Sequence, residues 1–194
     1  MLIKIFVGLT FAEDSFFAKK IQSFRTRYDE KIVANSSVHM PLVAPFEIPI
    51  TSLKSLEQEI TEELEGFFFG HEGDQSVTFT GIDVHSYGKK TLLYLHPEEQ
   101  ADMLHCAESI EQICREYVED REKRPRDDKK FLTIGRFMDP SSLHAALAVA
   151  QTEFRDCTEL PVSGVCLFQK NQGVWYQQAN LIEFNRVLAR PDSP

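Results

Sequence analysis

The order of strand-like and helix-like segments predicts an α+β fold with a largely antiparallel sheet. Two pairs of strand-like segments are joined by the short turn sequences "SYGK" (86–89) and "KNQG" (170–173), which are typical of hairpins. No glycine-rich turn leads from a strand into a helix, which argues against Rossmann and P-loop folds. The two halves also echo each other, because each contains a helix, an extended motif strand and a second helix. We therefore expect two pseudo-symmetric lobes around a central cleft, with the helices outside.

The first half of the chain is expected to begin with a strand and a helix. Apolar residues alternate along residues 2–9, which is the period of a strand with one buried face. They then recur at helical spacing between residues 17 and 28, and Asp14 or Ser15 is the expected cap. Prolines at 41, 45 and 49 exclude a helix over 37–50, so that segment is expected to be extended. An apolar stripe predicts the next helix over 52–68.

The second half is expected to contain two hairpins with two helices and a lone strand between them. Strands are predicted at 76–85 and 90–96, and again at 160–169 and 173–185. Helical periodicity covers 98–118 and 141–154, with the strand "FLTIGRF" (131–137) between them. The charged run 119–130 contains a proline and is expected to be a solvent-facing loop.

Length and charge limit what the chain can bind. Its 194 residues suffice for a substantial core, and we treat residues 1–194 as one domain of two lobes without a separate linker. The net charge of −9 argues against binding to duplex DNA, which needs a broad basic surface, but it leaves room for one small basic pocket. The opening stretch "MLIKIFVGL" is too short for a membrane span and lacks a signal-peptide cleavage site, so no membrane partner is expected.

The four cysteines indicate reduced thiols. Cys106 and Cys114 are eight residues apart on a predicted helix, a separation of about 12 Å that no disulfide spans. Cysteine, histidine and acidic residues show no metal-ligand spacing, so we expect neither a metal nor a cofactor. Reduced thiols in an ordinary globular composition predict a cytoplasmic protein.

Two extended segments carry the candidate chemistry, "VHMPLVAPF" (38–46) and "FLTIGRF" (131–137). Residues two apart in a strand point the same way, so His39 shares a face with Pro41, and Phe131 shares one with Thr133. A pair of H-x-T/S tripeptides on neighbouring strands would present two imidazoles and two hydroxyls to one cleft. That set suits phosphodiester chemistry, because one histidine can accept a proton, the other can donate one, and the hydroxyls can hold phosphoryl oxygens.

Over almost its whole length the chain resembles the 2H phosphoesterase superfamily, which includes 2′-5′ RNA ligase-like proteins and RNA 2′,3′-cyclic phosphodiesterases. "SVHMPLVAPF" is similar to the first family motif, and "KKFLTIGRF" is similar to the second, usually P-H-x-T-[IL]-[AG]-R. The central hairpin and helix and the closing hairpin, Tyr176 included, also resemble those of the family. The resemblance implies a two-lobed fold and a ligand that carries a phosphate, such as a nucleotide or an RNA terminus.

The sequence departs from the family at two of its four catalytic positions. The resemblance implies that His39 is the surviving acid or base and that Thr133 holds the phosphoryl group. Pro41 replaces the first hydroxyl residue, and Phe131 replaces the second histidine. Neither replacement can transfer a proton, and one general acid or base typically contributes about 10²–10⁴-fold in rate.

Further residues are candidates for binding the substrate. Arg136 stands where the family keeps an arginine and could work at the cleft edge, although it could also form a surface ion pair. Phe131 could pack in the core, plug the cleft or stack on a base. Lys130 belongs to a basic run that is either a solvated loop or a guide for anions, and Tyr176 lies in the closing hairpin. The same run contains Arg121, Lys123, Arg124, Arg126 and Lys129.

Two more residues could compensate for the lost groups. Lys170 lies near a serine position of the family and could replace a hydroxyl, and His96 is the most plausible substitute for the missing histidine.

Three functions are compatible with these residues. The first is a degenerate or weakly active 2H phosphoesterase-like protein that binds a nucleotide or RNA-end phosphate in a central cleft. The second is a competent 2′,3′-cyclic or 2′-5′ phosphodiesterase that uses His39 and Thr133. The third is a non-enzymatic, partner-binding protein on the same fold. The two lost positions favour the first, and the sequence does not determine the oligomeric state.

Overall fold

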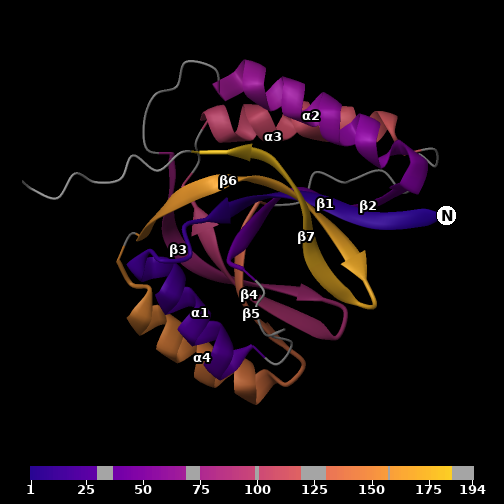
Figure 1. Cartoon of the computed structure of the whole chain (residues 1–194). Helices are drawn as coiled ribbons and strands as arrows, with labels where there is room; N and C mark the ends of the chain where they lie inside the picture. Colours follow the sequence, from indigo (N-terminus) through magenta and orange to yellow (C-terminus); the bar gives the residue numbers. More distant parts are fainter. Residues whose placement is uncertain (30–36, 69–74, 99–100, 119–129, 157, 185–194) are drawn as a thin grey trace, which may run out of the picture.

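The computed structural model describes residues 1–29, 37–68, 75–98, 101–118, 130–156 and 158–184. The strands are β1 (Leu2–Phe11), β2 (His39–Pro49), β3 (Ser76–Tyr87), β4 (Lys90–Pro97), β5 (Leu132–Phe137), β6 (Thr158–Asn171) and β7 (Val174–Glu183). The helices are α1 (Phe16–Tyr28), α2 (Leu53–Phe68), α3 (Ala101–Glu116) and α4 (Pro140–Glu153), and a 3-10 turn over Ile50–Ser52 precedes α2 (Figure 1).

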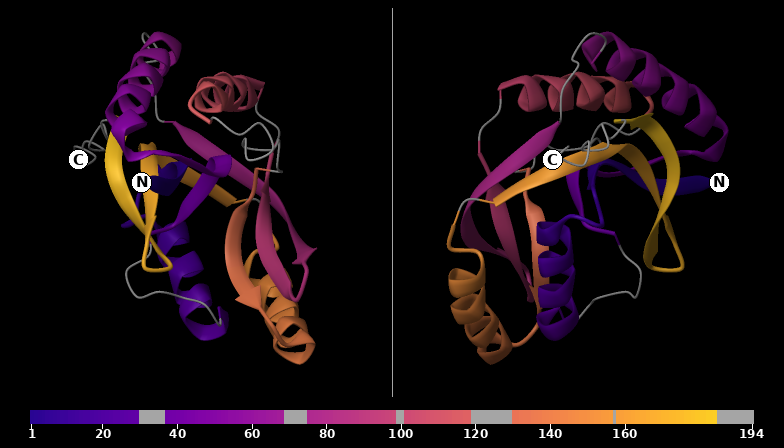
Figure 2. Two further views of the ribbon diagram at one scale, coloured as in Figure 1. Left: turned by 90° about the vertical axis from the view of Figure 1, so that its right-hand side faces the viewer. Right: turned by 60° about the vertical axis from the view of Figure 1, so that its left-hand side comes forward.

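The strands form an antiparallel sheet that the long strand β6 divides into two wings. The strand order is β2-β1-β6-β3-β4-β5, and β7 pairs with β6 beside this path. The first residues of β6, 158–161, pair with β3, whereas its later residues pair with β1 and β7. One strand thus joins the β2-β1-β7 wing to the β3-β4-β5 wing, and β2 and β5 come at opposite ends of the strand order (Figure 2).

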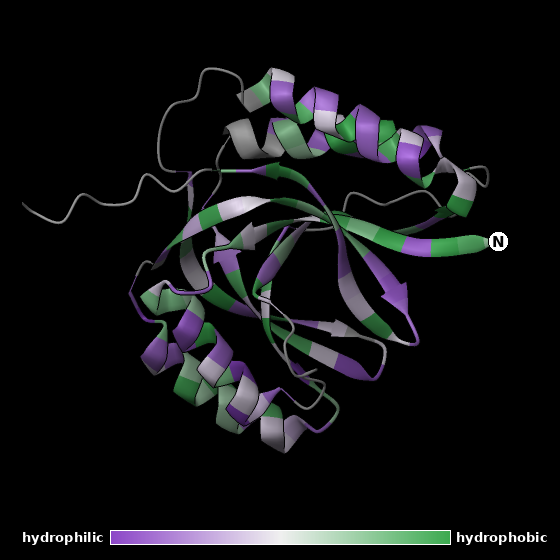
Figure 3. Ribbon diagram, viewed as in Figure 1, coloured by the Kyte–Doolittle hydropathy of each residue, from purple (hydrophilic) through white to green (hydrophobic). Residues whose placement is uncertain are grey.

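Each wing is covered by one pair of helices. Helices α2 and α3 pack on each other, with α2 against β7 and α3 against β2. Helices α1 and α4 also contact each other and pack on β4, β5 and β6. In Figure 3 the helices show hydrophilic residues on their outer surfaces, as expected for helices that bury one face against a sheet. The buried core is therefore formed between the sheet and these helices.

The three prolines of β2 stand on an edge strand. Among the described strands β2 pairs with β1 alone, and proline is tolerated on an edge strand because one side of its backbone has no ladder to complete. Strands β1 and β2 come close where Gly8 pairs with Pro41. A Cβ atom at Gly8 would lie 2.9 Å from the carbonyl oxygen of Met40. Glycine at this position permits β2 to approach β1 closely.

The structure confirms the α+β class and the antiparallel sheet, with element ends within a few residues of those expected. Ser15 caps α1 by accepting a hydrogen bond from the backbone amide of Ala18. Of the loop predicted at 119–130, residues 119–129 lie outside the described residues. Three cysteines, 106, 114 and 166, are buried free thiols. No helix in the described ranges has the length and apolar character needed to cross a membrane.

Candidate functional site

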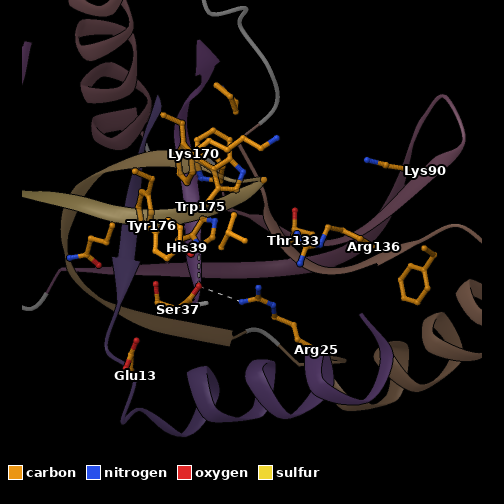
Figure 4. A pocket seen from close by; sticks show the side chains of 18 of the residues that line it. Glu13, Arg25, Ser37, His39, Lys90, Thr133, Arg136, Lys170, Trp175 and Tyr176 are labelled. Atoms are coloured by element: carbon orange, nitrogen blue, oxygen red, sulfur yellow. Dashed lines mark hydrogen bonds between the residues drawn. The ribbon is translucent and has the colours of Figure 1, made fainter. Parts of the chain in front are cut away.

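A cavity of about 720 Å³ lies between the two wings and receives both motif strands. Its wall is formed by side chains from β1, α1, β2, β4, β5 and the β6–β7 hairpin. His39 and Pro41 line it from β2, and Thr133 and Arg136 line it from β5 (Figure 4). The structure therefore brings together the surviving histidine, the surviving hydroxyl and the motif arginine.

His39 is the first residue of β2, and aromatic rings surround its side chain. Its ring centroid lies 5.4 Å from that of Phe6 and 5.0 Å from that of Phe168. The two phenylalanines stack on each other at 4.5 Å, so they form a continuous apolar wall beside the imidazole. The Nδ1 atom of His39 lies 2.9 Å from the carbonyl oxygen of Ser37. These contacts fix the orientation of the ring.

The surroundings of His39 keep it neutral at physiological pH. Burial lowers the pKa of His39 to about 4, and the positive charges of Arg25 and Arg136 act in the same direction. The hydrogen bond to Ser37 opposes this shift in part. Because a carbonyl oxygen can only accept, Nδ1 must carry the proton and donate it to Ser37. In the neutral ring the Nε2 atom therefore keeps its lone pair and can accept a proton.

Thr133 faces the same cavity from β5. Buried residues alternate along this strand with the half-buried positions 133 and 136, so Leu132 and Ile134 point into the core while Thr133 points to the cavity. Alternation on β2 is similar, since Met40 and Leu42 are buried in the core while His39 and Pro41 line the cavity. The predicted faces of both motif strands agree with this arrangement.

Phe131 lies beside the cavity wall and packs on Tyr94. The two rings stack at 4.3 Å with an angle of 27° between their planes. Tyr94 is directly opposite Thr133 in the β4–β5 pairing, and opposed residues in an antiparallel pair project to the same face. Phe131 is thus on the Thr133 side of the strand, but its ring covers Tyr94 and is absent from the cavity lining.

A charged cluster supports the β5 side of the cavity. Arg136 donates to Asp29 through Nε, at 3.1 Å, and through its terminal nitrogen, at 2.8 Å, while its backbone amide also donates to that carboxylate. The Asp29 side chain is 1% exposed and that of Arg136 is 33% exposed. The carboxylate holds Arg136 in a fixed direction at the end of α1. Arg136 is thus a paired arginine with one side toward the cavity.

Arg25 connects this cluster to the histidine. Its side chain is buried, lines the cavity, and donates to the Ser37 carbonyl at 3.4 Å. The same carbonyl accepts the Nδ1 proton of His39, as the two dashed lines in Figure 4 show. One backbone oxygen therefore couples the imidazole to a buried guanidinium.

The β6–β7 hairpin supplies an aromatic and basic wall. Trp175 contacts Phe6 edge-on at 4.8 Å, and the ammonium group of Lys170 lies 5.8 Å from the centre of the Trp175 ring. Tyr176 follows Trp175, lines the cavity and is 55% exposed. Figure 4 shows Lys170, Trp175 and Tyr176 on the His39 side of the cavity, away from Lys90 on the opposite side.

The lining is basic although the chain as a whole is acidic. Arg25, Lys90, Arg136 and Lys170 contribute to the wall, with Glu13 as the acidic residue among the lining side chains. Asp29 lies behind Arg136 and offsets part of this charge. In a chain with a net charge of −9, such a local excess of cations marks a place for an anion.

Other residues expected at the site lie elsewhere. Lys130 is nearly buried, and its ammonium group lies 3.8 Å from a carboxylate oxygen of Glu111 on α3. His96 contacts the Tyr94 ring at 5.7 Å and does not line the cavity. Among the described residues, no group of three histidine, cysteine or acidic side chains is arranged to hold a metal ion.

Sequence reasoning did not identify Arg25, Asp29 or Trp175. Arg25 and Asp29 are four residues apart and follow Ile21 on the inward side of α1, so a charged i, i+4 pair on an apolar stripe was the available signal. Trp175 precedes Tyr176 in the closing hairpin, but strand alternation alone could not show that both residues border the cavity.

The sequence model of the 2′-5′ RNA ligase superfamily matches residues 12–174. This range includes both motif strands and most of the chain, so the chain belongs to the 2′-5′ RNA ligase superfamily. The resemblance to 2H phosphoesterases is thereby confirmed. A search of curated protein sequences gave no match.

Solved structures share the fold at low sequence identity. E. coli LigT complexed with NADP+ superposes with a TM-score of 0.55 at 11% identity, covering 91% of this chain and 94% of LigT. E. coli LigT complexed with 3′-AMP gives a TM-score of 0.53 at 13% identity, with 92% and 95% covered. A structure described as a phosphoesterase gives 0.53 at 12% identity, with 91% and 94% covered.

Proposed function

We propose that the chain binds a nucleotide or an RNA-end phosphate in the cavity between β2 and β5, and that it hydrolyses ordinary phosphate esters only weakly. The observation that carries this proposal is the shared cavity of His39, Thr133 and Arg136, with basic and aromatic side chains around them. The nucleotides named in the two LigT complexes, NADP+ and 3′-AMP, support this class of ligand.

The weak hydrolysis follows from the groups that remain. A 2H-type reaction on a sugar ester needs a base for the attacking hydroxyl or water and an acid for the leaving oxygen. His39 can serve as the base through Nε2, but a pKa of about 4 makes it a feeble one at neutral pH. The second imidazole position holds Phe131, and the first hydroxyl position holds Pro41.

A competent cyclic phosphodiesterase is the second candidate. It is favoured by the common cavity of His39 and Thr133 and by the proton-free Nε2 atom, which could activate an attacking water. The two candidates differ in turnover rather than in the ligand they bind.

Calorimetric titration with 3′-AMP, together with turnover of 2′,3′-cyclic AMP, tests the proposal. We expect wild type to bind 3′-AMP, His39→Ala to bind it at least tenfold more weakly, and cyclic AMP turnover to be slow in both. His144→Ala, at an exposed position on α4, is the matched control and should bind like wild type. Rapid turnover that vanishes in His39→Ala would establish the competent enzyme instead. Absence of nucleotide binding by wild type would refute the proposal.

A further inference from the structure

The described lining of the cavity contains a proton acceptor, although a weak one, and no side chain well suited to donate a proton. His39 is the one imidazole among the described lining residues, and its Nδ1 proton is held by the Ser37 carbonyl. In the neutral ring the Nε2 atom is then the proton acceptor. The other cationic side chains of the wall are arginines and lysines, which stabilise negative charge far more readily than they release a proton at neutral pH.

This asymmetry selects among leaving groups. A sugar hydroxyl that leaves a phosphodiester departs as a strongly basic alkoxide and needs a proton in the transition state. A phosphate that leaves an anhydride departs as an anion that is stable at neutral pH, because its second pKa is about 6. Such a leaving group requires cations to offset its charge and needs no acid.

The cations lie where an extended diphosphate would need them. Arg136 and Lys90 border the Thr133 side of the cavity, whereas Lys170 lies on the His39 side above Trp175 (Figure 4). Two linked phosphates with a nucleoside at either end can extend across a cavity of about 720 Å³ and meet cations on both sides. Tyr176, which is exposed and lines the cavity next to Trp175, offers a ring for a base.

We propose that the preferred substrate is a phosphoanhydride-linked nucleotide, with His39 activating water at one phosphate and Lys170 and Arg136 holding the two phosphates. This proposal rests on the proposed function, since it places a nucleotide phosphate in the same cavity. A site with two histidines would be expected to cleave a sugar ester. The substrate proposed here differs because its leaving group needs no proton donor.

The reaction is a hydrolysis with water as the only co-reactant. The water oxygen forms a bond to one phosphorus while its proton passes to Nε2 of His39. The bond from that phosphorus to the bridging oxygen breaks, and the bridging oxygen retains the electron pair as part of the departing phosphate. The proton on His39 then passes to solvent, so two nucleoside monophosphates leave and the imidazole is restored.

The test compares diadenosine diphosphate, an anhydride, with the 2′-5′ dinucleotide of adenosine, an ester with a sugar leaving group. Wild type is expected to release AMP from the anhydride and to leave the ester intact under the same conditions. His39→Gln should abolish AMP release. Lys170→Met should reduce it at least tenfold, whereas Lys89→Met, at an exposed turn position outside the lining, should leave it unchanged.

The outcomes separate the inference from the proposed function. Equal cleavage of ester and anhydride, or cleavage that does not depend on His39, would overturn the inference. Binding of 3′-AMP without cleavage of the anhydride would also overturn it, while leaving the proposed binding function intact. Failure to bind 3′-AMP would remove both. Thermal unfolding of each variant verifies that a lost activity does not reflect a lost fold.

Discussion

The two motif strands border the same cavity, and each contributes a different functional group to it. β2 presents a histidine without a hydroxyl two residues later, because Pro41 stands there. β5 presents the hydroxyl of Thr133 without a histidine two residues earlier, because Phe131 stands there. His39 and Thr133 thus line one cavity from two strands, and each lacks the partner that an H-x-T/S tripeptide would provide.

The surroundings of the two strands explain how the fold accommodates this difference. On β2, the aromatic rings of Phe6 and Phe168 desolvate the imidazole and hold it neutral. On β5, Phe131 gains a stacking partner in Tyr94, and Arg136 is fixed by a buried carboxylate. The β2 side thus presents a neutral imidazole in an apolar setting, and the β5 side presents a hydroxyl and an arginine that a buried carboxylate holds in place.

Introducing the histidine that β5 lacks and the hydroxyl that β2 lacks should have the largest effect on the difference between the two strands. Phe131→His combined with Pro41→Thr is expected to raise turnover of 2′,3′-cyclic AMP by about 10²–10⁴-fold, the usual contribution of a general acid or base. Hydrolysis of the anhydride should change much less, since its leaving group needs no acid. Steady-state kinetics on both substrates measures the two responses.

The control for this variant is Phe131→Leu combined with Pro41→Thr, which removes the ring without adding an imidazole. The leucine variant loses the stacking contact with Tyr94, which contributes about 1 kcal/mol beyond the burial of the ring. A histidine variant that folds but stays as slow as the leucine variant would show that β5 is not the second catalytic strand.

Removing the carboxylate that holds Arg136 should produce the next largest effect, on stability. Asp29→Ala leaves Arg136 and the buried Arg25 without the negative charge between them, and breaking a buried ion pair costs about 3–5 kcal/mol. Urea unfolding should show this loss in the free energy of unfolding. Glu153→Ala is the matched control, because it removes the more exposed bidentate partner of Arg27 and should have a far smaller effect. Equal losses in the free energy of unfolding for the two substitutions would mean that the ion pair of Asp29 and Arg136 is exposed to solvent.

Most of the fold could be predicted from the sequence because the signals were local. Alternation specified the strands, helical spacing specified α1 to α4, and turn residues specified both hairpins. The order β2-β1-β6-β3-β4-β5 was not accessible in this way, since β6 reaches both wings from the far end of the chain. Such long-range pairing depends on tertiary packing rather than on any short pattern.

The candidate site was predictable where a residue stood in a motif. His39, Thr133, Arg136 and Tyr176 line the cavity, whereas Lys130 is paired with Glu111 on α3 and Phe131 is turned to Tyr94. The buried charges of α1 were missed because a helical stripe of apolar residues conceals a charged position within it. Their partners are Ser37, just before β2, and Arg136 on β5, and only the folded arrangement shows that they meet.

The smallest of the three predicted effects is a dependence of stability on pH that His39 causes. Its pKa falls from 6.5 to about 4 on folding, so between these values the unfolded chain binds a proton that the folded chain does not. The free energy of unfolding should therefore decrease as the pH falls from 6.5 to 4, by about 3 kcal/mol from this group at ~1.4 kcal/mol per pKa unit. Because carboxylates also titrate in this range, the quantity to measure is the difference between wild type and His39→Gln in urea unfolding, in acetate and MES buffers that contain no phosphate. Parallel curves for the two proteins would show that the imidazole is not held in its neutral form. A difference in the free energy of unfolding between wild type and His39→Gln that narrows as the pH falls toward 4 would show that His39 stays neutral above that pH. The imidazole would then be free of its proton throughout the range in which hydrolysis of an anhydride would use it.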